Sequence, residues 1–152
     1  MANLKPKLPQ TPSGRPLAVF VGDWAMEVVF PDPDMSTLRG VASFTWLERD
    51  ALLLLRSRVR GNGPPKSVSV IGADDSSKAF RMLYCDERGV SRHYEMTLSV
   101  RLWTLSRVAP GFHQRFIGRL SADRTTIRGE WEKSKEGRRW QHDFDVTYLR
   151  KR

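Results

Sequence analysis

The segment Arg139–Leu149, RWQHDFDVTYL, alternates large apolar or aromatic residues with polar ones along most of its length. A period of two residues is typical of a β-strand, because successive side chains of a strand point to opposite faces of the sheet. One face of this predicted strand carries a mostly aromatic row: Trp140, His142, Phe144, Val146 and Tyr148. The segment therefore predicts a strand that turns one face toward an apolar interior, with one histidine in the inward row.

Similar segments recur at regular spacing through the chain, and turn signals such as Gly61–Pro65 and Asp86–Gly89 separate them. About ten segments follow this pattern: 24–30, 41–48, 52–60, 68–73, 80–84, 93–100, 103–107, 112–120, 126–133 and 139–149. Many short strands joined by hairpin turns, without a sustained helical period, favour an all-β sandwich or barrel. Closing such a meander removes its unpaired edges. We predict an all-β fold: a closed antiparallel up-and-down barrel of about ten strands, preceded by a short helical turn over Leu17–Val21.

The composition predicts one folded domain. The chain has 152 residues, of which 39% are hydrophobic, and this excludes a wholly disordered protein. We expect a flexible proline-rich arm over residues 1–16, a barrel domain over 17–149 and a basic tail over 150–152. The longest apolar run, Ala51–Leu55, is far shorter than a membrane-spanning helix, which excludes a membrane partner of that kind. Residues 1–16 also lack the layout of a secretion signal, and the single Cys85 fits a reducing compartment, so we expect a cytoplasmic protein.

The positive charge lies mainly in the second half of the chain. The formal net charge is +9; residues 1–76 hold 9 basic and 8 acidic residues (+1), and residues 77–152 hold 17 and 9 (+8). The basic residues are spread singly along the predicted strands and form no known nucleic-acid-binding motif. We interpret them mostly as the solvated exterior of the barrel, and nucleic acid is a disfavoured partner.

Some short motifs resemble those of known barrel families. Gly22-Asp23-Trp24 resembles the Gly-x-Trp start of the calycin proteins, the lipocalins and their relatives, and it stands before a meander of the right length. Other segments are similar to a bacterial family of lipocalin-like proteins: Tyr84–Val90, Arg115–Gly118, Gly129–Trp131 and Trp140–Asp145. The resemblance covers about residues 17–148. It implies a lipocalin-like barrel whose first Trp plugs one end and whose interior often holds a small apolar ligand.

The Gly22–Trp24 start and the closing Thr147-Tyr148, followed by basic residues, also resemble nitrobindin, and more distantly the chain resembles barrels like the fatty-acid-binding proteins. Nitrobindin is a ten-stranded barrel that binds haem through a histidine near its C-terminus. This chain has Ala25–Glu27 in place of the glycines that follow the Trp in nitrobindin, and Asp143–Asp145 where the ligand histidine is expected. A carboxylate is a poor substitute for the imidazole that holds haem iron. We therefore expect no haem and no other cofactor. The three histidines share no metal-ligand spacing, so we expect no metal site.

Six residues are candidates for contact with a ligand inside the barrel: Trp46, Arg56, Tyr94, Arg115, Trp131 and His142. The aromatic residues either fill a small barrel or form the wall of its cavity. An arginine that points inward could pair with a ligand carboxylate, and Tyr94 or His142 could orient a ligand or transfer a proton. A structural alternative for an arginine is a cation–π contact with Trp24 at the sealed end.

Three functions remain open on the sequence. The first is binding of a small, mainly apolar molecule. This molecule could be anionic if an arginine points inward. The second is a cofactor-free isomerase or cyclase that uses the chamber as its active site, with His142, Tyr94 or Glu95 as the acid–base group. The third is nucleic-acid binding through the basic surface. The sequence assigns no catalytic residue, and a homodimer is an open expectation.

Overall fold

The barrel consists of ten antiparallel strands and is preceded by one short 3-10 helix; the computed structural model describes residues 13–152. The elements are η1 (Arg15–Phe20), β1 (Gly22–Val29), β2 (Leu38–Glu48), β3 (Leu52–Val59), β4 (Ser67–Ala73), β5 (Phe80–Asp86), β6 (Ser91–Leu98), β7 (Leu102–Arg107), β8 (His113–Leu120), β9 (Thr126–Ser134) and β10 (Gln141–Arg150). The predicted all-β architecture with its N-terminal helical turn is confirmed.

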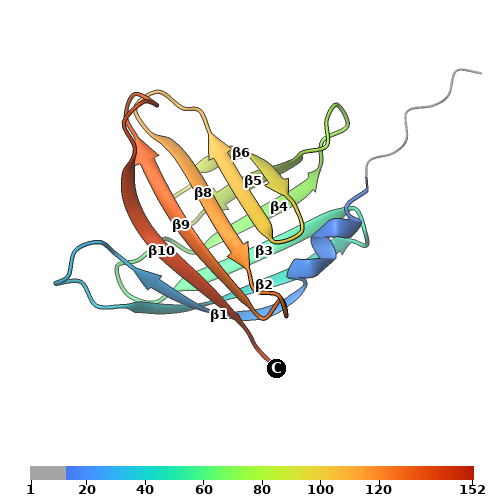
Figure 1. Ribbon diagram of the computed structural model, residues 1–152, viewed down its shortest axis with the longest axis horizontal. Coiled ribbons are helices and arrows are strands. Elements are labelled where there is room, and N and C mark those ends of the chain that lie inside the picture. Colours follow the sequence, from blue (N-terminus) through green and yellow to red (C-terminus); the bar gives the residue numbers. More distant parts are fainter. Residues whose placement is uncertain (1–12) are drawn as a thin grey trace, which may run out of the picture.

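Each strand pairs with the next one in the sequence, and β1 also pairs with β10, which closes the barrel. In the closing pair, Trp24 lies opposite Arg150 and Val28 lies opposite Val146. Figure 1 shows the strands wrapped around a common interior, with η1 beside the β2–β3 turn and away from the β1–β2 loop. We call the end near η1 the closed end, and the end formed by the β1–β2, β3–β4, β5–β6, β7–β8 and β9–β10 loops the mouth.

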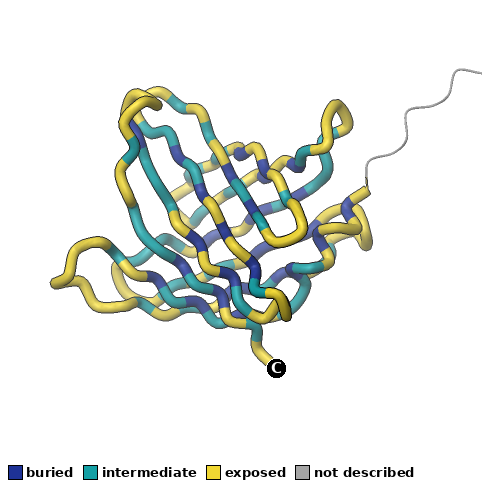
Figure 2. The backbone as a smooth tube through the Cα atoms, viewed as in Figure 1, coloured by how far each residue is buried: buried dark blue, intermediate teal, exposed yellow. Residues whose placement is uncertain are grey.

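Burial alternates along most strands, as Figure 2 shows, because inward and outward side chains alternate. In β1 the inward Trp24, Met26 and Val28 are buried, whereas the outward Asp23 and Val29 are exposed. A strand with one apolar face has its register determined by burial, since a slip of one residue would place that face in water.

Aromatic side chains fill the closed end. Phe20 of η1 is fully buried, and its ring lies 5.2 Å from that of Phe44 and 4.8 Å from that of Trp103. The indole Nε1 of Trp24 donates a hydrogen bond of 2.8 Å to the carbonyl oxygen of Phe20. Pro16 starts η1 well because its ring holds a helical φ angle and its missing N–H is not needed in a first turn. The helix therefore acts as a plug whose apolar face continues the core of the barrel.

Arg150 covers this plug from outside. Its guanidinium lies 4.1 Å from the centre of the Trp24 ring, and it donates hydrogen bonds to the carbonyl oxygens of Val19 and Val21, each at 2.6 Å. Gly22 gives the guanidinium room, because a β-carbon there would lie 2.9 Å from Nη1, and its φ of +135° is one that glycine tolerates best. An arginine does contact Trp24, as the structural alternative predicted.

Two predicted boundaries need correction. Most of the predicted arm, residues 1–16, lies outside the described residues, but Arg15 and Pro16 belong to η1. Arg150, assigned to a solvated tail, is instead the last residue of β10, because its contacts with Trp24 and the η1 carbonyls hold it to the barrel. Within residues 13–152, no helix has the length and apolar character needed to cross a membrane.

Candidate functional site

The barrel encloses a cavity of about 350 Å³ between the aromatic plug and the mouth. Its walls are inward residues of nine strands, and it extends to the loops of the mouth through Asn62–Pro65 and Phe112. Trp103, 1% exposed, separates it from the plug, and Tyr148 lies beside Trp103 with a ring separation of 6.1 Å. Pockets for small molecules in proteins range from roughly 300 to 1,000 Å³, so this cavity is at the small end of that range.

One wall of the cavity is apolar and aromatic. It is formed by inward residues of β9, β10 and β1 and by the residue after β1: Trp131, Phe144, Val146, Tyr148, Met26, Val28 and Phe30. The Trp131 and Phe144 rings are stacked, with centres 6.3 Å apart and planes 29° apart. Phe116 of β8 continues the surface, since its ring lies 5.1 Å from that of Trp131. A flat ring of a ligand could pack against this wall.

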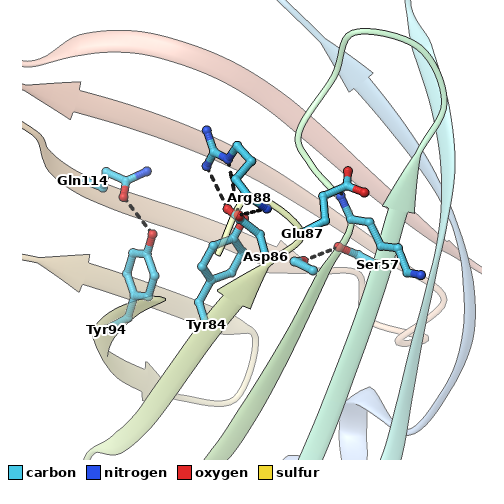
Figure 3. A network of polar contacts seen from close by, with 9 residues as sticks. Ser57, Tyr84, Asp86, Glu87, Arg88, Tyr94 and Gln114 are labelled. Atoms are coloured by element: carbon cyan, nitrogen blue, oxygen red, sulfur yellow. Dashed lines mark hydrogen bonds and ion pairs between the residues drawn. The ribbon is translucent and has the colours of Figure 1, made fainter. Parts of the chain in front are cut away.

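Polar side chains line the cavity at positions on β3, β4, β6 and β8. Ser57 of β3 and Ser67 of β4 form a hydrogen bond of 2.9 Å between their hydroxyl groups, and the buried Ser69 lies next on β4. Tyr94 of β6 donates a hydrogen bond of 2.7 Å to Oε1 of Gln114 on β8 (Figure 3). Burial raises the pKa of Tyr94, so its phenol stays protonated at neutral pH. These groups offer hydroxyl and amide partners to a molecule bound among the apolar residues of the lining.

A carboxylate network lies at the mouth, at the end of β5. Asp86, whose side chain is fully buried, accepts a hydrogen bond of 2.8 Å from Tyr84 and one of 2.7 Å from Nη2 of Arg88 (Figure 3). The hydrogen bonds from Arg88, followed by that from Tyr84, hold the pKa of Asp86 well below its usual range. Burial, and then the bond to Asp86, raise the pKa of Tyr84. Arg88 and Asp86 therefore neutralise each other in this part of the lining.

Two glycines on the paired strands β8 and β9 make room for the Phe116 ring. Gly118 lies opposite Gly129, and β-carbons at these positions would collide with the ring atoms of Phe116. The ring is also held by Trp103, at 4.8 Å between ring centres. The size of the cavity near Phe116 therefore depends on the absence of a β-carbon at Gly118 and Gly129.

The structure places two of the six predicted ligand residues in the cavity lining, namely Tyr94 and Trp131. Trp46 faces inward but lies beyond Phe44, at the closed end, where it packs against the core. Arg56 is exposed on the outer face of β3, because Leu55 and Ser57 occupy the inward positions on either side of it. It lies in a shallow outer groove with Arg58, Lys66 and Lys151 and cannot pair with a molecule in the cavity.

Arg115 also points away from the cavity, because its neighbours Gln114 and Phe116 take the inward positions of β8. Its guanidinium forms an ion pair of 2.8 Å with Glu132 and lies 4.2 Å from the centre of the Trp140 ring. Both partners belong to the outer surface of the barrel, so Arg115 contributes to the exterior.

His142 lies outside the barrel because β10 contains an irregularity that the alternation does not reveal. The pairing of β10 with β9 shifts register between His142 and Phe144, as in a β-bulge. The bulge reverses the faces of the residues before it, so that Asp143 lines the cavity while His142 is exposed and bonds Asp145 at 2.8 Å. The prediction of an inward row that includes His142 is therefore wrong at its N-terminal end.

His142, Asp145 and Glu130 form a cluster on the outer face, with one potential ligand atom from each within 4.8 Å of the others. These residue types could hold a divalent cation. The hydrogen bond between His142 and Asp145 already accounts for two of the three side chains.

Haem held by a histidine does not fit the residues of this cavity. No histidine is among its lining residues in the described part of the chain. His93 and His142 are exposed, and Nδ1 of His113 accepts a hydrogen bond from the backbone N–H of Ala109. The imidazole ligand that the nitrobindin resemblance implies thus has no counterpart in the chamber.

Several lining residues escaped the sequence interpretation, above all Arg92, Gln114, Tyr84 and the serines of β3 and β4. Arg92 and Gln114 are polar residues at inward positions of their strands. The only sequence signal for them is their spacing of two residues from an inward apolar or aromatic neighbour. Arg92 lies two positions before Tyr94, so an inward Tyr94 already implies an inward Arg92.

The fold is similar to that of a known structure. The chain superimposes on Rv2717c from M. tuberculosis with a TM-score of 0.59 and 12% sequence identity, over 91% of this chain and 96% of the other. At this identity the comparison shows a shared fold alone. No protein-family model and no curated protein matches the sequence.

Proposed function

We propose that this protein binds one small, mainly apolar molecule inside its barrel. The observation that carries the proposal is the cavity of about 350 Å³, which stays open between the plug and the mouth although aromatic side chains surround it. Protein interiors are normally packed without large voids, because an unfilled apolar space loses both dispersion contacts and transfer free energy. A preformed chamber with few polar groups is the usual form of a small-molecule site.

The lining supports binding better than catalysis. Of the three acid–base candidates, Glu95 lies outside and forms an ion pair of 3.0 Å with Arg81, and His142 is exposed on the outer face. Tyr94 alone reaches the cavity, and its phenol is protonated and bonded to Gln114. A general base must be able to take up a proton near neutral pH, so Tyr94 does not supply one.

Fluorescence of N-phenyl-1-naphthylamine, a neutral aromatic probe, tests the proposal. We expect saturable binding of one probe per protein, with emission excited by energy transfer from the tryptophans near the cavity. The matched variant Ser69→Phe places a ring in the chamber, because Ser69 is 2% exposed and lines the cavity. It should weaken probe binding by about tenfold or more, since an aromatic ring displaces the volume that the probe needs.

Thr45→Phe is the control, because Thr45 is exposed on the outer face of β2 and the added ring has the same size. It should bind the probe as the original protein does. If the original protein shows no saturable binding, or if both variants lower the affinity equally, the cavity is not the binding site.

A further inference from the structure

Arg92 places a positive charge at the mouth of the cavity. It is the second residue of β6, its side chain lines the chamber, and its guanidinium carbon lies 5.2 Å from the ring centre of Phe112 and 5.9 Å from that of Tyr84. A guanidinium group packs well on aromatic faces, and its N–H groups, which lie in the guanidinium plane, can still donate to a ligand. The two rings therefore flank Arg92, and its guanidinium also lies within reach of the Tyr94 hydroxyl.

The other charged residues of the lining are neutralised by partners. Arg88 forms an ion pair of 2.7 Å with Asp86, and Asp143 forms one of 3.3 Å with Lys133. Arg92 forms no ion pair with any carboxylate between residues 13 and 152. Arg92 and Tyr94 line the same cavity, and the charge of Arg92 together with its hydrogen bond to Tyr94 opposes the rise that burial causes in the pKa of Tyr94. The cavity lining thus carries one uncompensated positive charge.

The shape of the remaining lining limits what can accompany an anionic group. The chamber is small, and its apolar wall contains several aromatic rings, among them the stacked pair of Trp131 and Phe144. Offset stacking and edge contacts favour a flat aromatic body over a long flexible chain, which would also lose more conformational entropy in so small a space. The amide of Gln114, two positions before Phe116 on β8, also lines the cavity. Its Oε1 is already used by Tyr94, which leaves the NH₂ group to donate.

We propose, on the basis of the proposed binding function, that the ligand is a compact aromatic anion whose rings pack against Trp131 and Phe144 and whose charged group pairs with Arg92 at the mouth. A carboxylate or sulfonate could accept two parallel N–H bonds from the guanidinium. Binding then requires no ionisable group of the protein to change state, since arginine stays charged at any physiological pH.

Two probes with the same ring system test this inference. 1-Anilinonaphthalene-8-sulfonate is N-phenyl-1-naphthylamine with one added sulfonate, so a comparison of their affinities isolates the anionic group. We expect the original protein to bind the sulfonate about tenfold more tightly than the neutral probe, because a hydrogen bond to a partly buried charged partner contributes at least that factor.

The variant Arg92→Met removes the charge and keeps an unbranched side chain. It should weaken binding of the sulfonate by about tenfold and change binding of the neutral probe by less than about twofold. Arg56→Met is the matched control on the outer face and should leave both affinities unchanged. Arg92→Lys, which keeps the charge and loses the planar fork, should fall between Arg92→Met and the original protein.

The outcomes separate the two proposals. If neither probe binds the original protein, the binding function itself fails. If the neutral probe binds and the sulfonate binds no more tightly, the chamber accepts apolar molecules and the anion proposal is overturned. Equal loss of both probes in Arg92→Met also overturns it, because Arg92 would then act only on the shape of the mouth. The sulfonate comparison in the original protein decides the question even if Arg92→Met does not fold.

Discussion

Replacing Arg150 by methionine should destabilise the barrel, although Arg150 lies on its outer surface. Arg150 donates hydrogen bonds to three carbonyl oxygens, those of Val19, Val21 and Arg124, at 2.6, 2.6 and 3.1 Å. The same guanidinium lies 4.1 Å from the centre of the Trp24 ring. Methionine keeps much of the apolar contact with Trp24 and removes every donor, so the variant isolates the polar contribution.

The magnitude follows from the number and exposure of these contacts. A hydrogen bond from a charged donor contributes roughly 1.5–3 kcal/mol when buried. Arg150 is only partly buried, and water can reach carbonyl oxygens that lose it, so each bond contributes less here. A cation–π contact adds about 0.5–1 kcal/mol at an exposed site. Together these values predict a loss of about 2–4 kcal/mol in the free energy of unfolding.

Urea unfolding followed by tryptophan fluorescence measures this loss, because Trp24 and Trp103 contact Phe20 of the plug and report on its packing. Arg150→Met should lower the urea midpoint without a change of slope. Arg150→Lys should recover only part of the loss, since an ammonium cannot reach three diverging carbonyls. Arg128→Met is the control: Arg128 is exposed and lies opposite Arg119, so its removal should be neutral or slightly stabilising.

A loss below about 0.5 kcal/mol in Arg150→Met, the usual range for surface substitutions, would refute the reasoning. Water would then replace the guanidinium at the three carbonyls without cost. The cavity gives a second check, because Arg150 lies at the closed end. The folded fraction of Arg150→Met should bind N-phenyl-1-naphthylamine with the affinity of the original protein.

Two further variants test the cavity wall and the mouth. Gly129→Ala should lower the free energy of unfolding by about 1–3 kcal/mol and weaken probe binding, because the new methyl group meets the Phe116 ring, and Trp103 and Trp131 restrict the movement of that ring. Urea unfolding measures the first effect and titration with the neutral probe measures the second. An unchanged stability would show that the ring has space to move. Asp86→Asn should reduce the loss of stability on acidification. The pKa of Asp86 is depressed in the folded state, so its contribution is present above about pH 4 and is lost as the pH falls below that value. Unfolding at pH 7 and at pH 3 measures the difference, with Asp34→Asn in the β1–β2 loop as control; an equal acid-induced loss in both variants contradicts the assignment.

The barrel could be predicted because one physical pattern governs most of the chain. A strand with one buried face must alternate apolar and polar residues, and hairpin turns need glycine and proline at few positions, so both signals are visible in the sequence. Closure itself follows from the cost of unpaired edges. Arg150 was harder to place, because a basic residue near a chain end is usually solvated and its partners, Val19 and Val21, accept through backbone oxygens that carry no sequence signal.

The site could be predicted only in part, because it depends on parity at single positions. Tyr94 and Trp131 line the cavity as predicted, because aromatic residues in alternating segments usually face inward. Arg56 and Arg115 have the chemistry that suits an anionic ligand, yet each stands beside an apolar residue that takes the inward position. Arg92 has the same chemistry, but it occupies an inward position of its strand. A candidate arginine in a barrel strand should therefore be judged first by its register with the buried residues two positions away.

The bulge in β10 has a consequence for the charge of the cavity. Regular alternation would place His142 inside and Asp143 outside, whereas the register shift before Phe144 brings Asp143 to the mouth and leaves His142 on the surface. Because Asp143 pairs with Lys133, the bulge exchanges a titratable imidazole for a neutralised carboxylate. The charge of the lining is then set by Arg92, and arginine side chains stay charged at any physiological pH. We therefore expect the affinity for an anionic probe to stay constant between about pH 5 and pH 8, where a histidine in the chamber would change its charge.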